Sequence, residues 1–111
     1  MKLPNGAKAQ LGDKLERYCL NMEHPKGKDK AIMFRDRLGI TLENRVILVN
    51  ALLQSAIANE ATIYKIDAYG THYDIKFSFT TEVGTSLILG CWIVRIDEDF
   101  PRLTNTYPVD K

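Results

Sequence analysis

A change in hydrophobic period at Asn59-Glu60 constrains the fold of this chain more than any other feature. Before this point, apolar residues recur every three to four positions, which is the spacing of one helical face. From Ala61 onward, apolar and polar residues alternate, as on a strand with one buried face. The switch predicts an α+β fold, with a helical part over residues 1–60 and an antiparallel sheet over residues 61–108.

The individual elements follow from the local patterns on either side of this switch. We expect three helices, near residues 14–20, 28–38 and 42–59, and four strands, near residues 62–68, 72–79, 86–96 and 101–107. Short connections make neighbouring strands antiparallel and keep them in sequence order. The expected architecture is a single domain, residues 1–111, with three N-terminal helices packed on one face of a four-stranded antiparallel sheet.

The apolar positions of these elements predict a core. Thr41 is expected to cap the third helix, whose buried stripe would be Leu42, Val46, Val49, Leu53 and Ile57. On the other elements, the side chains expected to be buried are Phe34, Ile75, Phe77 and Trp92.

The net charge of +1 limits the kinds of partner that the whole surface can attract. Affinity for nucleic acid through overall charge is expected to be poor, so any such binding must come from local clusters. No apolar leader follows Met1, and the longest apolar stretch, Val46 to Ala58, is too short to span a bilayer. We therefore expect a cytoplasmic protein without membrane contact, in which Cys19 and Cys91 are reduced thiols.

Positive charge is concentrated in one segment, His24-Pro25-Lys26-Gly27-Lys28-Asp29-Lys30. Lysines beside a helix N-terminus can hold a phosphate, because free backbone N–H groups and ammonium groups then point at the same spot. His24 adds a group that titrates near neutral pH. The alternative is a solvated, lysine-rich loop.

The last expected strand carries a guanidinium and two hydroxyls on one side, from Arg102, Thr104 and Thr106. These groups can bind a phosphate and stabilise charge that develops on it. The alternative is an edge strand with a polar outer face. His72 lies on the polar face of the second strand, and with His24 it is one of two histidines available as a general acid or base. A surface residue is the alternative for His72.

Other chemistries lack support in the sequence. The acidic turn Asp97-Glu98-Asp99 has no histidine at metal-ligand spacing, so neither a metal nor a cofactor is expected. The motifs of serine hydrolases, kinases and zinc hydrolases are missing from the chain, and neither cysteine has a local nucleophile signature.

Several segments resemble a family of small bacterial domains of unknown function. They are the opening MKLPNG, the YCLN that leads into HPKGK, and the closing WIVR followed by DFPRL. The resemblance covers nearly the whole chain. Such domains are similar to toxin modules, which occur beside a small antitoxin or at the end of larger secreted toxins. Their order of elements resembles the metal-independent ribonuclease fold shared by barnase, EndoU, colicin tRNases and RelE-type toxins.

The resemblance implies a toxin-like, metal-independent endoribonuclease of a bacterial toxin–antitoxin or polymorphic toxin system. RNA would be its substrate, and a small antitoxin or immunity protein its partner. The site would lie on the open sheet face, with catalytic roles for His24, Arg102 and Thr104. Together with His72, the groups expected to bind substrate are Lys26, Lys28, Lys30 and Thr106. Related domains carry a hydroxyl residue where this chain has Asn105, which leaves open which face of the last strand carries the site.

A non-catalytic interaction module is the alternative function. An antitoxin-like or assembly protein would use the open sheet face to bind another protein. Salt-sensitive RNA binding with cleavage favours the ribonuclease, whereas stable one-to-one association with a protein, without cleavage, favours the module.

Overall fold

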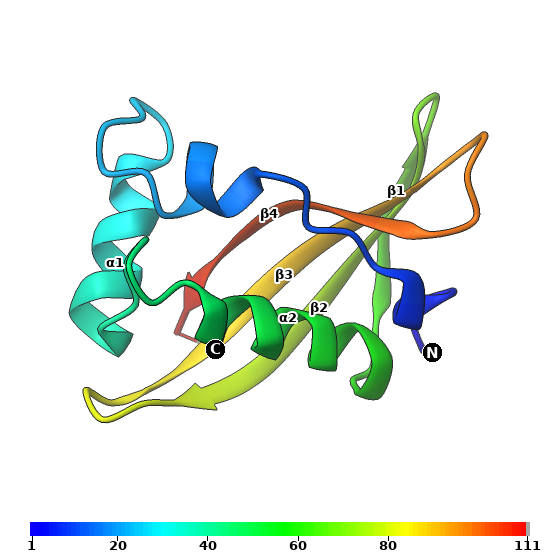
Figure 1. Ribbon diagram of the computed structural model, residues 1–111. Helices are drawn as coiled ribbons and strands as arrows, with labels where there is room; N and C mark the ends of the chain where they lie inside the picture. The colour runs from blue at the N-terminus through cyan, green and yellow to red at the C-terminus, as the bar shows by residue number, and fades with distance from the viewer. Residues whose placement is uncertain (111) are drawn as a thin grey trace.

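The second half of the chain forms a four-stranded antiparallel sheet in which strands adjacent in sequence are adjacent in space. Figure 1 shows the computed structural model, which describes residues 1–110. The strands are β1 (Thr62–Asp67), β2 (Gly70–Thr80), β3 (Thr85–Arg95) and β4 (Pro101–Val109). The predicted α+β class and the predicted order of four antiparallel strands are confirmed.

The first half of the chain supplies the helical segments. They are a 3-10 turn η1 (Gly6–Lys8), a π-helical turn η2 (Leu15–Cys19) and the two α-helices α1 (Lys28–Leu38) and α2 (Val46–Ala58). Helix α1 has the predicted bounds. It ends at Gly39, whose φ of 67° lies in the left-handed region that glycine adopts without strain.

The start of α2 differs from the prediction, because Thr41 does not cap it. The helix begins at Val46, after a turn that Asn44 holds in place. The Asn44 Oδ1 accepts a hydrogen bond from the Thr41 N–H (2.8 Å), and its Nδ2 donates to the Gly39 carbonyl (3.0 Å). Such side-chain bonds to nearby backbone compete with helix formation, which explains the later start.

The predicted buried stripe of α2 is also wrong. Val46 and Ile57 are exposed, with relative accessibilities of 60% and 53%, and Leu42 lies outside the helix. Val49 and Leu53 are only partly buried. The helix instead buries a neighbouring face, formed by Leu48, Leu52, Ser55 and Ala56. Because α2 is apolar on nearly every side, several stripes satisfy the helical period, and only the tertiary fold selects one.

The core lies against one face of the sheet, which α2 crosses in Figure 1. Tyr73 faces Trp92 across the β2–β3 pair, and Phe77 faces Ile88. These side chains share one cluster with residues of η2, α1 and α2, including Cys19, Phe34 and Leu52. The predicted burial of Phe34, Ile75, Phe77 and Trp92 is confirmed. The opposite face of the sheet, which bears His72, Ile93 and Arg102, is called the open face below.

The two edge strands of the sheet differ in the segments that contact them. At the β4 edge, Gln10 donates its N–H to the Pro101 carbonyl and accepts from the Leu103 N–H, both at 2.9 Å. Helix α1 also packs against β4. Strand β1 forms the other edge, where β2 is its one strand partner among residues 1–110. Within residues 1–110, no helix combines the length and apolar character that crossing a membrane requires.

Candidate functional site

A bulge in β4 decides which of its side chains reach the open face. Arg102 pairs with Ile93 and Asn105 with Cys91, so Thr104 is an extra residue at the register shift. The expected shared side of Arg102, Thr104 and Thr106 is therefore wrong. Thr106 faces the core with no exposed surface, and its Oγ1 donates to the Leu89 carbonyl (2.8 Å).

The open face carries a hollow of about 270 Å³, here called the open-face pocket. All four strands line it. The polar and aromatic side chains around it come from Tyr64, Lys65, His72, Asp74, Cys91, Thr104, Asn105 and Tyr107. Cavities that combine convergent polar groups with aromatic walls are the usual form of small-ligand sites. Of the residues proposed from the sequence, His72 and Thr104 lie here.

His72 is held by a carboxylate at the rim of the pocket. Its Nε2 lies 3.0 Å from the Asp67 Oδ2, and its side chain is only 19% exposed. A carboxylate can only accept, so Nε2 carries the hydrogen of this bond, and in the neutral imidazole Nδ1 is then the acceptor. Asp67 is fixed in turn, because its Oδ1 accepts from the backbone N–H groups of Tyr69 (3.0 Å) and Gly70 (3.3 Å).

The Asp67 carboxylate also contacts a lysine that lines the pocket. The Lys65 Nζ lies 3.5 Å from the Asp67 Oδ2. Partial burial raises the pKa of Asp67, but the hydrogen bonds from His72, Tyr69 and Gly70 outweigh it, so the net pKa is lowered. Asp67 therefore stays ionised near neutral pH and keeps both basic side chains in place.

Cys91 lies on the floor of the pocket but is no nucleophile. Burial, and then the charge of Asp74 and a hydrogen bond with it, raise the pKa of the Cys91 thiol to about 12. Only the thiolate attacks, and it is scarce at neutral pH when the pKa is this high. Covalent chemistry at this cysteine is therefore disfavoured, and Asp74 remains as an acceptor for hydroxyl or amino groups of a ligand.

Thr104 and Asn105 offer the pocket different groups. The Thr104 Oγ1 donates its hydrogen to the Cys91 carbonyl (3.1 Å), so its hydroxyl is left only as an acceptor. The Asn105 Oδ1 accepts from the Thr106 N–H (2.9 Å) and lies 3.7 Å from the Cys19 Sγ. The amide Nδ2 of Asn105 is thus the group with hydrogens to offer an anion.

Tyr107 connects the pocket to the helical half. Burial raises the pKa of Tyr107, so the phenol carries its proton at neutral pH. The Lys30 Nζ lies 5.5 Å from the Tyr107 ring centroid and donates to the Tyr18 hydroxyl (3.0 Å). Among the lysines proposed from the sequence, Lys30 is the one whose contacts reach a pocket residue.

The segment containing His24 forms a self-contained loop. The His24 Nδ1 accepts the backbone N–H groups of Lys26 and Gly27, each at 3.0 Å, and its ring meets Tyr18 edge-on at 4.9 Å. A Cβ at Gly27 would lie 2.1 Å from the Tyr18 carbonyl oxygen, so this close approach requires glycine. His24 thus shapes the loop, from which the exposed side chains of Lys26 and Lys28 extend.

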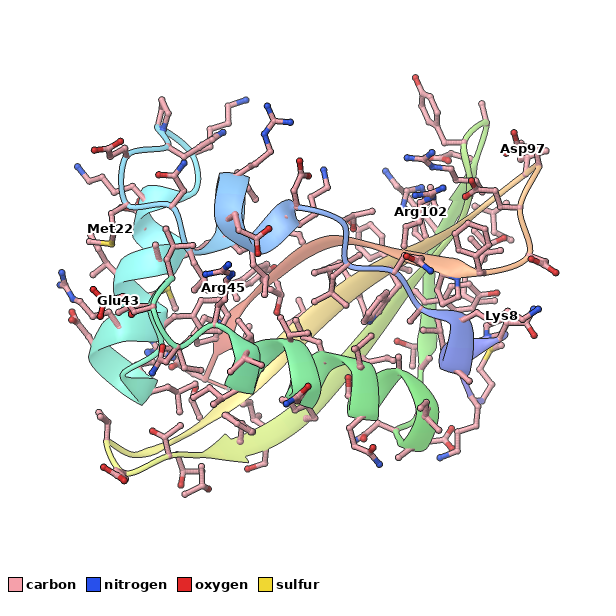
Figure 2. The ribbon with its side chains drawn as sticks, in the orientation of Figure 1. Lys8, Met22, Glu43, Arg45, Asp97 and Arg102 are labelled. Atoms are coloured by element: carbon pink, nitrogen blue, oxygen red, sulfur yellow. The ribbon has the colours of Figure 1, made fainter. Side chains whose placement is uncertain are left out.

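Arg102 is engaged on the open face, away from that loop. Its Nε and Nη2 donate to the Glu98 carboxylate at 2.8 and 2.7 Å, and its guanidinium lies 4.9 Å from the Phe100 ring centroid. Figure 2 shows Met22, which lies two residues before His24, at the left of the view and Arg102 in its right half. His24 and Arg102 line separate hollows, so the structure does not bring them into one site.

Of the eight polar and aromatic side chains named for the pocket, sequence reasoning missed six: Tyr64, Lys65, Asp74, Cys91, Asn105 and Tyr107. The alternation of polar residues on the strands could have identified Lys65 beside His72. The same alternation puts Asn105 and Tyr107 on the face opposite Arg102, because a bulge leaves no mark in a period of two. Within residues 1–110, the structure contains no group of three or more His, Cys, Asp or Glu residues that could hold a metal ion.

Comparisons with known proteins bear on the family of this chain and not on its activity. No curated protein and no solved structure matches it. The matching family model carries no activity in its description, so the resemblance to toxin modules stays a prediction. That model, for the domain of unknown function DUF6883, matches residues 2–110, and the chain therefore belongs to this family.

Proposed function

We propose that this protein is a metal-independent endoribonuclease, acting in the cytoplasm, whose active site is the open-face pocket. One observation carries the proposal: His72, oriented by Asp67, stands in a pocket that also offers Lys65, Asn105 and Tyr107. A histidine held by a carboxylate is suited to proton transfer near neutral pH. The proposal requires that the three helices cover the other face of the sheet and leave this one to the substrate.

The reaction that fits these groups is attack of a ribose 2′-hydroxyl on the adjacent phosphate. The His72 Nδ1 takes the proton of the 2′-hydroxyl as the 2′-oxygen bonds to phosphorus. The bond from phosphorus to the 5′-oxygen breaks, and this oxygen takes a proton from the Tyr107 phenol. The products are a 2′,3′-cyclic phosphate and a 5′-hydroxyl. A proton returns from imidazolium to phenolate through solvent, which completes the balance.

Protein cations and donors stabilise the negative charge of the transition state. Lys65 and the Asn105 amide contact the phosphate oxygens, and the Lys30 ammonium stabilises the phenolate that forms on Tyr107. The phosphate lies toward Lys65 and away from the carboxylate of Asp74, because like charges repel. These groups supply the electrostatic part of catalysis without a metal, so EDTA is expected to leave the rate unchanged.

The test is cleavage of a fluorogenic RNA oligonucleotide by the wild type and by His72→Ala. We expect His72→Ala to lower kcat by about 100-fold or more, since general base catalysis contributes roughly 10²–10⁴-fold. Mass spectrometry of the products should find a 2′,3′-cyclic phosphate, and 2′-deoxy substitution at the cleaved position should abolish the reaction.

The matched control is Ser78→Ala, which removes an exposed polar group from β2 outside the pocket lining. It should cleave at the wild-type rate, and both variants should melt like the wild type. Full activity in His72→Ala, or cleavage that depends on an added divalent cation, would contradict the proposed site.

A second function, a protein-interaction module, is favoured by a separate observation. Exposed apolar side chains gather along β1 and the adjoining loops, and we call them the apolar edge cluster: Ile63, Tyr64, Ile66, Tyr69 and Ile96. Three of them, Ile66, Tyr69 and Ile96, are more than 70% exposed, and the Ile96 N–H donates to the Tyr69 carbonyl (3.2 Å). The cluster lies on both faces of β1, because Ile63 and Ile66 pair with Tyr73 and Thr71 on the core side, whereas Tyr64 lines the open-face pocket. Exposed apolar surface is typical of interaction sites.

The two functions are compatible if the partner is an inhibitor. Tyr64 belongs to the cluster and also lines the pocket, so an antitoxin or immunity protein seated on β1 would cover the entrance to the site. Ile66→Lys should then weaken binding of that protein without changing RNA cleavage. Stable one-to-one binding by a wild-type protein that cleaves no RNA would favour the interaction module alone.

A further inference from the structure

A second hollow of about 280 Å³ adjoins the open-face pocket, with Thr104 in the lining of both. We call it the flanking hollow. Its wall is formed by the start of β4, the end of β3 and the segment that precedes η2. The basic side chains in that wall are Lys14, Arg95 and Arg102. This concentration of positive charge is not used by the reaction described above.

The strand register relates the two hollows. Lys65 pairs with His72, His72 with Ile93, and Ile93 with Arg102, so these four residues form one row across the open face. Neighbouring strands lie about 4.8 Å apart, which puts the backbones of His72 and Arg102 at about 10 Å. The flanking hollow therefore lies beside a phosphate that reacts at His72, on the side of β3 and β4, where a neighbouring phosphate of the same strand can lie.

The cations of the flanking hollow differ in how far they are already neutralised. Arg102 is paired with Glu98 at 2.7 Å, and Asp13 is paired with Arg17 at 3.2 Å. Lys14 and Arg95 form no ion pair with any residue from 1 to 110, and both are exposed. The hydrogen bond from Arg102 lowers the pKa of Glu98 most, and the charge of Arg95 helps to lower it, so this carboxylate lies near Arg95 without forming an ion pair with it. Two cations without an ion pair, beside a pocket that handles phosphate, are suited to a second phosphate.

We infer that the flanking hollow is a binding subsite for a neighbouring phosphate of the same strand, so that the substrate is a single-stranded RNA longer than a dinucleotide. Lys14 and Arg95 bind that phosphate, and Thr104, which lines both hollows, lies between the two subsites. This inference rests on the proposed ribonuclease function, because it assigns the reacting phosphate to the open-face pocket.

The experiment compares two RNA substrates, a dinucleotide with one phosphate and an octamer with the same cleaved step. The measured quantity is the ratio of kcat/KM for the octamer to that for the dinucleotide. We expect this ratio to be well above one for the wild type. It should fall about three- to fivefold in Arg95→Gln or Lys14→Gln, because an exposed charge contact contributes up to ~1 kcal/mol. Lys8→Gln, an equal loss of charge on exposed η1, should leave the ratio unchanged.

The salt dependence of kcat/KM is a second measurement of the contact between the flanking hollow and the neighbouring phosphate. The slope of log kcat/KM for the octamer against log salt concentration should become shallower by about 0.7 for each phosphate that the variant no longer neutralises. The slope for the dinucleotide should not change. An Arg95→Gln variant with the wild-type ratio and the wild-type slope would overturn the subsite while leaving the ribonuclease proposal intact.

Measuring the binding of an RNA that cannot be cleaved tests the subsite independently of catalysis. The 2′-deoxy octamer cannot be cleaved, and its affinity is measured by fluorescence anisotropy. Weaker binding by Arg95→Gln than by Lys8→Gln supports the subsite even if no RNA is cut, in which case only the proposed reaction fails. Equal binding by the two variants, or no binding by the wild type, would overturn the proposed subsite.

Discussion

At the scale of single residues, the two histidines show how much a side chain's role depends on its hydrogen bonds. The Nδ1 of His24 accepts two N–H groups of its own loop, whereas the Nε2 of His72 donates to a carboxylate at the rim of the open-face pocket. Both are histidines among lysines and polar residues in the sequence. Only the fold distinguishes the histidine that shapes its own loop from the one that a carboxylate holds beside a pocket.

Cys91 provides a prediction at the same scale. Its pKa of about 12 means that the thiolate fraction at pH 8 is about 1 in 10⁴, against about one quarter for an ordinary thiol of pKa ~8.5. Alkylation of Cys91 by iodoacetamide, followed by peptide mass spectrometry, should be about three orders of magnitude slower in the folded protein than in urea. Its rate should rise about tenfold per pH unit from pH 7 to 10. A plateau near pH 9 would show that the thiol has an ordinary pKa.

At the scale of elements, α2 illustrates where periodicity stops being informative. Its predicted existence is confirmed, but its predicted rotation and start are wrong, because its sequence is apolar on most sides and Asn44 holds the preceding turn. The amphipathic strands are different, since alternation puts Ile75 and Phe77 on the correct face. Alternation fails after the bulge at Thr104, because the extra residue puts Thr106 on the core face and Asn105 in the pocket.

The rotation of α2 can be tested by truncating one residue on each face. Leu52→Ala should lower the free energy of unfolding by about 3 kcal/mol, because Leu52 is fully buried and its loss leaves a cavity. Val46→Ala, on the exposed side near the start of the helix, should change it by less than about 0.5 kcal/mol. Urea denaturation followed by circular dichroism measures both. A larger loss for Val46→Ala would restore the stripe expected from the sequence.

At the scale of the whole molecule, the core joins the helical part to the sheet. One cluster contains side chains from η2, α1, α2, β2, β3 and β4, so neither half buries its apolar surface without the other. We therefore expect a single cooperative transition. Trp92 is the one tryptophan of the chain and is fully buried, so its fluorescence reports on the unfolding of the sheet. Far-ultraviolet circular dichroism in the helical band, at about 222 nm, reports on the unfolding of the helices.

The two signals should give the same midpoint in urea. Separate midpoints would mean that the residues before and after position 60 unfold as independent units, and would contradict the expectation of one domain. The sequence supports that expectation through its length, because 111 residues are the size of one ordinary domain. The contacts that join the two halves depend on side chains distant in the chain, such as Cys19 and Asn105, and no local pattern reveals them.

The unequal edges of the sheet limit how this molecule can polymerise. Gln10 and α1 occupy the β4 side, whereas the outer backbone groups of β1 have no neighbouring strand among residues 1–110. A sheet with one available edge accepts a single additional strand, and two such sheets joined through that edge have none left. Growth by edge pairing therefore closes at a pair, so exposed β1 does not lead to an open-ended fibre of folded molecules.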